Sequence, residues 1–341
     1  MPDSPVFALD FSHWKHKPLR LCFPGKTLKF VSGTDQIPRD AALVVWGMRA
    51  VPEAEARGVS VIRIEDGFLR SVGLGADLIR PLSWVVDASG MYFDSTRPSD
   101  LECLLAETRF PDDLLQRAKT LRERIVMAGL TKYNVGTSTW QRPERPCRVV
   151  LVPGQVESDA SLAYGAPDIK TNLGLLQAVR RSNPDAHILY KPHPDVVAGL
   201  RAPGHDEGEA GRWCDERVVD APMGELLRAV DEVHCLTSLA GFEALLRGKK
   251  VVCYGQPFYA GWGLTTDKAP LARRNRSLQF DELVAGALIL YPRYMSRKRE
   301  ALVSPEEALD ELVEWQTRSG GHTSWWRKAF RVVLRRVVGM R

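Results

Sequence analysis

This 341-residue chain lacks the sequence motifs with which many enzymes bind nucleotides, and this absence is its most informative feature. Neither G-x-G-x-x-G nor a Walker A sequence occurs, which removes the main support for a dinucleotide- or ATP-binding protein. No D-x-D occurs either, which disfavours metal-dependent handling of a nucleoside diphosphate sugar. We therefore expect protein groups to neutralise a single phosphate, with no metal ion and no cofactor.

Clustered cysteines and long apolar runs are also absent. The six cysteines contain no C-x-x-C pair, which is typical of free or buried thiols in a reducing cytoplasm. No apolar run approaches the roughly 20 residues of a membrane-spanning helix, and no signal-peptide pattern opens the chain. With 44% hydrophobic and 26% charged residues, the composition predicts a folded cytoplasmic protein.

Acidic residues are missing from one end of the chain. From Trp315 onward there are seven Lys or Arg residues and no Asp or Glu, whereas the rest is nearly neutral, which argues against nucleic-acid binding. From Trp325 the helical period separates two faces. The apolar face holds Trp326, Phe330, Val333, Leu334, Val337 and Met340, and the basic face holds Arg327, Lys328, Arg331, Arg335 and Arg336. This pattern predicts a basic amphipathic helix that lies in a membrane interface, or else a final helix packed across the two domains.

The chain length suits two domains, and short apolar runs alternate with helical segments in both halves. Such alternation predicts an α/β protein of two Rossmann-like domains that face a cleft, with parallel strands buried on both faces. We expect domains at 1–140 and 145–295, followed by C-terminal helices at 296–341. Predicted strands lie at 28–31, 42–47, 59–64, 148–153, 187–190, 218–219, 233–236 and 250–254, and predicted helices at 111–127, 171–179, 223–230 and after Thr237.

Candidate catalytic residues follow the expected strand ends. Glu65 and Asp66 begin a loop with three glycines and Arg70, where an acid, a base and backbone N–H groups converge; a βα turn with solvated charge is the alternative. Asp159 lies in the segment Gln155–Ser161, which opens the first loop of the second domain. A carboxylate there can stabilise an oxocarbenium-like transition state or attack the anomeric carbon of a sugar, or Ser158 or Asp159 can cap the next helix.

Two further segments favour phosphate binding. His193 stands between two prolines after a predicted strand and beside Lys191, so a rigid turn holds a ring that can bind phosphate or protonate a leaving group. Thr237 and Ser238 precede a short helix, whose N-terminal N–H groups and dipole favour an anion. The loop from Gln256 to Thr265 is dense in aromatic residues, which bind sugar rings and bases but also pack in cores.

Five segments in order resemble the KpsC/LipA capsule-polysaccharide proteins. They are Glu65–Ser71, Gln155–Asp159, Lys191–Pro194, Thr237–Leu245 and Tyr254–Thr265, within a match that runs from about Trp46 to Tyr294. The resemblance implies a GT-B-like, retaining β-Kdo transferase that uses CMP-β-Kdo and extends a lipid-linked acceptor. Familiar members carry two transferase modules in tandem, whereas this sequence holds one.

The resemblance also implies roles for individual residues. Asp159 becomes the candidate nucleophile, and Glu65 and Asp66 become acid/base and acceptor-side carboxylates. The implied donor-binding residues are Lys191, His193, Thr237, Ser238, Glu243, Gln155, Arg70, Ser71, Gln256 and Trp262. The alternatives are a transferase for another activated sugar and a non-catalytic capsule assembly or export factor.

Overall fold

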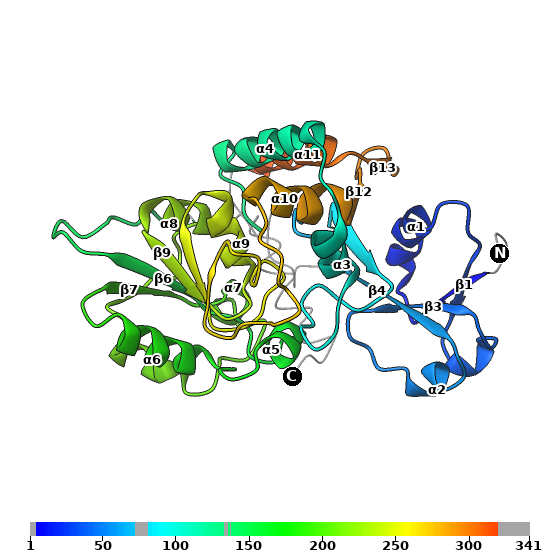
Figure 1. Cartoon of the computed structure of the whole chain (residues 1–341), viewed down its shortest axis with the longest axis horizontal. Helices are drawn as coiled ribbons and strands as arrows, with labels where there is room; N and C mark the ends of the chain where they lie inside the picture. Colours follow the sequence, from blue (N-terminus) through cyan, green and yellow to red (C-terminus); the bar gives the residue numbers. More distant parts are fainter. Residues whose placement is uncertain (1–4, 72–80, 133–135, 137, 320–341) are drawn as a thin grey trace.

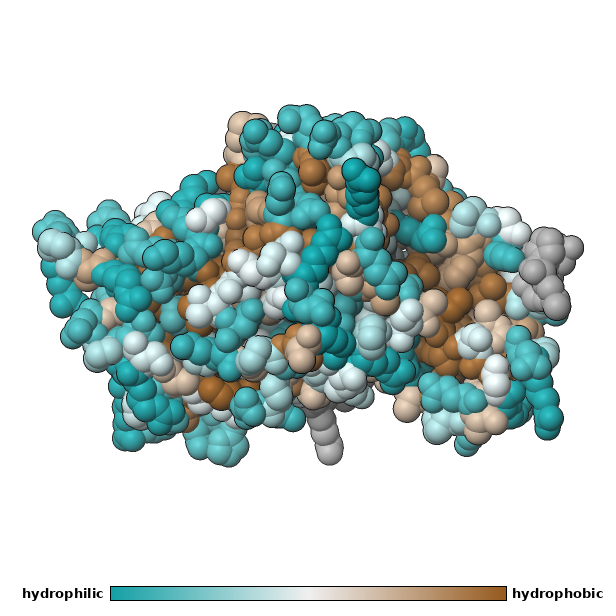
Figure 2. Space-filling model, in the orientation of Figure 1, coloured by the Kyte–Doolittle hydropathy of each residue, from teal (hydrophilic) through white to brown (hydrophobic). Residues whose placement is uncertain are grey.

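The computed structural model describes residues 5–71, 81–132, 136 and 138–319, which form two α/β domains side by side (Figure 1). The predicted basic helix after Trp325 lies outside these residues. No helix in the described part of the chain is long and apolar enough to cross a membrane. On the face shown in Figure 2, apolar side chains are visible over the first domain and beneath the helices at the domain junction.

The first domain is built on a seven-stranded sheet of order β13-β12-β5-β4-β3-β1-β2. Strands β1 to β4 are parallel, as predicted for the segments 28–31, 42–47 and 59–64, whereas β5, β12 and β13 each run antiparallel to their neighbours. The strands are β1 (Val6–Leu9), β2 (Leu28–Val31), β3 (Ala42–Trp46), β4 (Ser60–Asp66), β5 (Ser83–Asp87), β12 (Pro292–Met295) and β13 (Leu302–Val303). Its helical segments are α1 (His13–Cys22), η1 (Thr34–Gln36), α2 (Pro52–Glu55), α3 (Asp100–Glu107) and α4 (Asp112–Met127).

Two predictions for this sheet need correction. The segment 28–31 was expected to be a buried strand, but β2 is the edge strand and is only partly buried, because the unpredicted strand β1 takes the buried position beside β3. Strand β12 falls within the expected second domain, 145–295, yet it pairs with β5 of the first sheet. The chain therefore crosses back to the first domain before residue 295.

The second domain holds a six-stranded parallel sheet of order β11-β10-β9-β6-β7-β8. Its strands are β6 (Val149–Pro153), β7 (His187–Lys191), β8 (Glu216–Arg217), β9 (Glu232–Cys235), β10 (Lys250–Cys253) and β11 (Thr266–Asp267). The predicted strand at 218–219 is displaced, since β8 ends at Arg217. Its helical segments are α5 (Ala160–Gly165), α6 (Asn172–Ser182), α7 (Pro194–Val197), η3 (Glu207–Arg212), α8 (Met223–Ala229) and α9 (Leu239–Leu246).

Side chains of this second sheet alternate between two cores, as expected for a parallel sheet covered on both faces. Val149 and Leu151 pack with α8 and α9, whereas Val150 and Val152 pack with α6. The first of these cores continues into α3, α4, α10 (Phe280–Val284), η4 (Ala285–Leu290) and α11 (Pro305–Ser319). Figure 1 shows α4, α10 and α11 above the junction, so shared apolar packing fixes the two domains against each other.

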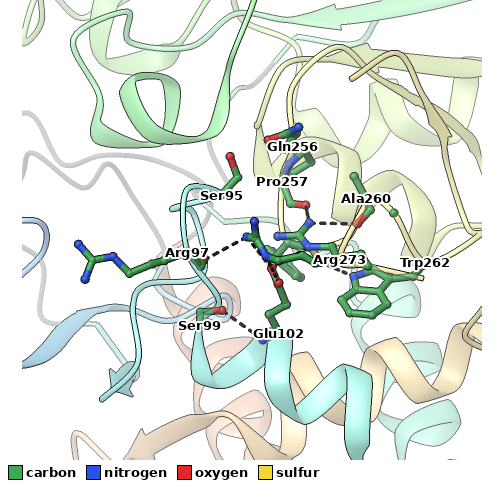
Figure 3. A network of polar contacts seen from close by, with 12 residues as sticks. Ser95, Arg97, Ser99, Glu102, Gln256, Pro257, Ala260, Trp262 and Arg273 are labelled. Atoms are coloured by element: carbon green, nitrogen blue, oxygen red, sulfur yellow. Dashed lines mark hydrogen bonds and ion pairs between the residues drawn. The ribbon is translucent and has the colours of Figure 1, made fainter. Parts of the chain in front are cut away.

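A buried ionic network adds to this junction (Figure 3). Glu102 of α3 accepts a hydrogen bond from Arg274 Nε at 2.8 Å and pairs with Arg273 as well. Arg274 also donates to the Ala260 carbonyl at 3.0 Å, within the loop dense in aromatics. If the loop moved away from α3, these buried charges would lose their partners, which is costly. The network therefore holds the loop against the first domain.

Candidate active site

A cavity of about 460 Å³ lies between the two domains. Its walls come from the carboxyl ends of β3 and β4 on one side and of β6, β7 and β9 on the other. The loops after parallel strands meet at such an edge, where open α/β sheets bind their ligands. Of the predicted site residues, the cavity brings together Glu65, Asp66, Gln155, Asp159, Lys191, His193, Thr237, Ser238 and Glu243.

Glu65 and Asp66 form the carboxylate wall of the first domain. The Asp66 backbone N–H donates to Glu65 Oε1 at 2.9 Å. Burial raises the pKa of Glu65 to about 7, and the negative charges of Asp66 and, more weakly, Asp159 add to the rise. Gly47 faces this carboxylate with φ +56°, and an added Cβ would lie 3.2 Å from Glu65 Oε2. Glu65 is thus poised to exchange a proton near neutral pH.

Arg70 and Ser71 lie behind this wall and do not line the cavity. The buried Arg70 donates from Nε to Asp66 Oδ2 at 2.6 Å and from Nη1 to Ser71 Oγ at 3.0 Å. Arg70 therefore orients Asp66.

Asp159 faces Glu65 from the second domain. It is the N-cap of α5, where its Oδ1 accepts from the Ser161 N–H at 3.0 Å, so the helix-capping interpretation is correct. The side chain is exposed and lines the cavity, which leaves Oδ2 available for chemistry. Capping and nucleophilic attack are therefore compatible, because a carboxylate has acceptor sites on both oxygens. Glu157, in contrast, accepts backbone hydrogen bonds from Asn172 and His205 and lies outside the cavity.

His193 caps α7, and its Nδ1 accepts from the Asp195 N–H at 3.2 Å. Burial lowers the pKa of His193 to about 4, and the positive charge of Lys132 lowers it further. The ring is therefore neutral at pH 7. Because Nδ1 is the acceptor, the proton resides on Nε2, so the geometry fits a hydrogen-bond donor better than an imidazolium acid.

Lys191 ends β7 and is almost fully buried. Its Nζ donates to the carbonyls of Val219 at 3.1 Å and Ala221 at 2.8 Å. Burial lowers the pKa of Lys191 to about 8. Lys191 thus braces the loop after β8 and supplies positive potential at the cavity wall.

Gln155 joins the loop after β6 to the start of α9. Its Nε2 donates to Thr237 Oγ1 at 3.0 Å, and its Oε1 accepts from the Thr237 N–H at 2.9 Å. Ser238 caps α9 by accepting from the Ala240 N–H at 3.2 Å. The paired amide and hydroxyl groups therefore fix a helix N-terminus that opens toward the cavity.

Two cations at the cavity were not identified from the sequence. Lys132, just after α4, lines the cavity, and its positive charge lowers the pKa of Glu65, Glu243 and His193 together. Its backbone N–H donates to Glu243 Oε1 at 2.5 Å, and burial raises the pKa of Glu243 to about 7. Arg201, beyond α7, is the second cation. Only the fold brings either residue to the site, since no motif surrounds them.

Two further predicted binding residues, besides Arg70 and Ser71, do not line the cavity. Trp262 is fully buried, and its Nε1 donates to the Phe258 carbonyl at 2.8 Å, so it packs the core. Gln256 Nε2 lies 3.4 Å from the Pro270 carbonyl. From the same loop, Pro257 and Phe258 line the cavity instead. Among the described residues, no group of three or more His, Cys, Asp and Glu side chains is placed to hold a metal ion.

Fold and site together define a two-domain α/β protein with carboxylates facing hydrogen-bond donors and cations across an interdomain cavity. A family model described as capsule polysaccharide biosynthesis protein matches residues 42–135 and 110–294, and the chain belongs to this family.

Sequence relatives agree with this assignment. The chain is 43% identical over 335 residues to the capsule polysaccharide modification protein LipA of Neisseria meningitidis serogroup A, covering 95% of this chain and 48% of LipA. It is 45% identical over 280 residues to the lipopolysaccharide-processing protein LpsZ of Rhizobium meliloti, covering 80% of this chain and 64% of LpsZ. The chain thus spans about half to two thirds of these relatives' lengths.

Two solved structures from Thermosulfurimonas dismutans share the fold. The KpsC β-Kdo 2,7 transferase superposes with a TM-score of 0.77 at 42% identity, covering 92% of this chain and 100% of that one. The KpsC β-Kdo 2,4 transferase has the same TM-score at 31% identity, covering 90% and 98%. The prediction of a two-domain transferase fold of this family is confirmed.

Proposed function

We propose that this protein is a retaining β-Kdo transferase that moves Kdo from CMP-β-Kdo to a lipid-linked acceptor during synthesis of a capsular polysaccharide. The main support is the near-complete overlap with a solved Kdo transferase at 42% identity. The carboxylates of Asp159 and Glu65 on opposite cavity walls supply the two groups that double displacement requires.

In the first step, an Asp159 carboxylate oxygen bonds to the anomeric carbon as the bond from that carbon to the CMP oxygen breaks. The electron pair stays on the phosphate, and CMP leaves as a phosphomonoester. The Nε2–H of His193, the N-terminus of α9 and the Lys132 charge stabilise the growing negative charge. These protein groups make a metal ion unnecessary in this proposal, and we expect undiminished turnover in EDTA.

In the second step, an acceptor hydroxyl oxygen attacks the same carbon and displaces the Asp159 carboxylate. Glu65 takes the hydroxyl proton, as its raised pKa of about 7 permits. Two inversions restore the original anomeric configuration. Because identity to the 2,7 transferase is 42% and to the 2,4 transferase 31%, we expect a 2,7 linkage.

CMP release from CMP-Kdo, measured with and without a Kdo-bearing acceptor, tests this proposal. Acceptor-dependent CMP release and a new β-Kdo linkage by NMR are the expected results. A transferase for UDP-sugars would ignore CMP-Kdo, and an assembly factor would release neither CMP from CMP-Kdo nor UDP from a UDP-sugar.

The proposed site of action is the cytoplasmic face of the inner membrane, where the basic segment after Trp325 would contact anionic lipid. Each basic residue near such a surface contributes about 1 kcal/mol. Deletion after Gly321 should leave a folded enzyme that uses a short water-soluble acceptor but no longer co-sediments with phosphatidylglycerol vesicles. Unchanged vesicle binding would refute this contact.

A further inference from the structure

A second, smaller cavity of about 190 Å³ lies on the first domain. It is bounded by the first half of β4, the end of α2 and the turn after β5. Within the described part of the chain, its lining contains the guanidinium groups of Arg63 and Arg97 and a single carboxylate, that of Glu55. The catalytic steps proposed above use none of these three side chains.

Arg63 lies on the same strand as Glu65 of the main cavity. It stands two residues before Glu65 on β4, so both side chains project from the same face of the strand, about 7 Å apart along its axis. Its side chain is only 8% exposed, and Nη1 donates to the carbonyls of Gly47 at 2.9 Å and Arg49 at 3.1 Å. Nη2 lies 4.0 Å from Glu55, beyond hydrogen-bond distance.

Arg97 is anchored by its backbone and projects its side chain. The Arg97 carbonyl accepts from Arg273 Nη2 at 3.1 Å, and Figure 3 shows the guanidinium pointing away from that network. The buried Asp94 lies 3.5 Å from Nε and orients the side chain, which is 52% exposed. Its neighbour Ser95 donates from Oγ to the Tyr164 carbonyl at 2.9 Å, so this loop borders the second domain.

The two guanidinium groups of this cavity lie close enough to repel each other, and the carboxylates of Glu55 and the buried Asp94 offset part of their charge. Burial lowers the pKa of Arg63, and the positive charge of Arg97 lowers it further, which means that the two guanidinium groups repel each other. Glu55 is half exposed and too distant for a close ion pair. A bound anion would relieve this repulsion, and planar guanidinium groups bind carboxylate and phosphate oxygens with defined geometry.

We infer that Arg63 and Arg97 form an acceptor subsite for an anionic group, a carboxylate or a phosphate, one unit away from the hydroxyl that reacts at Glu65. This inference rests on the proposed transferase function, since it places a charged acceptor along β4. The anion comes either from the acid group of a preceding sugar or from the phosphate of the lipid linker.

Arg97→Gln is the main test variant, because it removes the charge and leaves the backbone contact with Arg273 intact. Arg181→Gln is the matched control: Arg181 is exposed on α6 and lines neither cavity. Three acceptors distinguish the sources of the anion. The first carries one Kdo on an uncharged alkyl group, the second carries two Kdo units on that group, and the third carries one Kdo on phosphoglycerol.

The inference predicts that Arg97→Gln raises KM about tenfold for one charged acceptor, as expected for losing a charge-assisted hydrogen bond. The kcat value and the KM of the single-Kdo alkyl acceptor should stay within twofold. An effect on the two-Kdo acceptor identifies a sugar carboxylate, and an effect on the phosphoglycerol acceptor identifies a phosphate. Equal KM values for wild type and Arg97→Gln with all three acceptors would overturn the inference.

A binding titration of the acceptors in the absence of CMP-Kdo tests the anion subsite independently of the proposed transferase activity. By saturation-transfer NMR, the two-Kdo glycoside and the phosphoglycerol acceptor should bind to wild type and Arg181→Gln alike, and one of them about tenfold more weakly to Arg97→Gln. That result would support the subsite even if CMP-Kdo proved not to be the donor. Equal affinity of both compounds for Arg97→Gln and wild type would refute the subsite, whatever the activity.

Discussion

The two walls of the main cavity differ in how their charge is controlled. On the first-domain wall, Glu65 and Asp66 are adjacent at the end of β4, and burial raises the pKa of Glu65 to about 7. On the second-domain wall Lys191 is buried and His193 partly buried, and this burial lowers the pKa of His193 to about 4 and that of Lys191 to about 8. Burial therefore favours the neutral form on both walls: it raises the pKa of the acid on one wall and lowers the pKa of the two bases on the other.

This difference suggests a division of labour. The first-domain wall holds a carboxylate that changes protonation near neutral pH, as a base for an acceptor hydroxyl must. The second-domain wall holds neutral or fixed donors, which suit a phosphate whose charge grows during departure. Asp159 and Glu243 are carboxylates on this donor wall, and the proposed function makes Asp159 the nucleophile.

The largest expected effect follows from Asp159→Asn. Asparagine caps helices about as well as aspartate, so the fold and CMP binding should persist while the nucleophile is lost. We expect transfer to fall by at least about 10⁴-fold, measured as acceptor-dependent CMP release. Asp168→Asn is the control, since Asp168 is exposed and lies outside the cavity. Near-wild-type turnover in Asp159→Asn would place the nucleophile elsewhere.

Removing the base on the acceptor wall should cost about 10²–10⁴-fold in rate, tested with Glu65→Gln. In wild type, Glu65 must be deprotonated to act, so kcat/KM should rise with pH through about 7 and level off above it.

Asp66→Asn sharpens this prediction. Removing the neighbouring negative charge lowers the pKa of Glu65, so the acidic limb of the profile should move to lower pH. The exposed Asp185→Asn should leave the limb in place. A limb that stays put, or moves to higher pH, in Asp66→Asn would contradict the role given to Glu65.

His193→Ala should reduce the rate by about 10²–10³-fold, the range for losing one donor to a developing anion. Because the ring is neutral, proton NMR should find that His193 titrates well below pH 6. A titration near 6.5 would return the residue to the role of an imidazolium acid.

The smallest effect concerns the start of α9. Ser238→Ala removes its cap and should weaken CMP binding by about tenfold or less, within the range of about 0.5–2 kcal/mol for a cap. Ser99 caps α3 away from the cavity, so Ser99→Ala should lower stability alone. Calorimetric titration with CMP measures both variants, and equal CMP affinities would argue against a role for the α9 terminus.

The second domain was predicted better than the first. Its sheet is wholly parallel, and buried parallel strands appear in a sequence as short apolar runs, whereas the first sheet also contains antiparallel strands. Val149–Pro153 and His187–Lys191 were recognised in this way. The pairing of β12 with β5 joins residues 292 and 85, and no local pattern records such a contact.

The same limit applies to the site. Strand ends indicated Glu65, Asp159 and His193, since topology places those ends together. Lys132 lies after α4, outside any recognisable motif, and only tertiary packing brings it to the cavity. Trp262 was expected to bind ligand but is buried, because composition cannot distinguish an aromatic residue in the core from one at a surface.

The most direct test of the central claim is intact-protein mass spectrometry of Glu65→Gln incubated with CMP-Kdo and acceptor. This variant retains the nucleophile but slows the second displacement, so a covalent intermediate should accumulate. We predict a mass gain of one Kdo unit, located on the peptide that contains Asp159 and absent when Asp159→Asn is added. Turnover without any adduct, or an adduct that survives Asp159→Asn, would contradict the account.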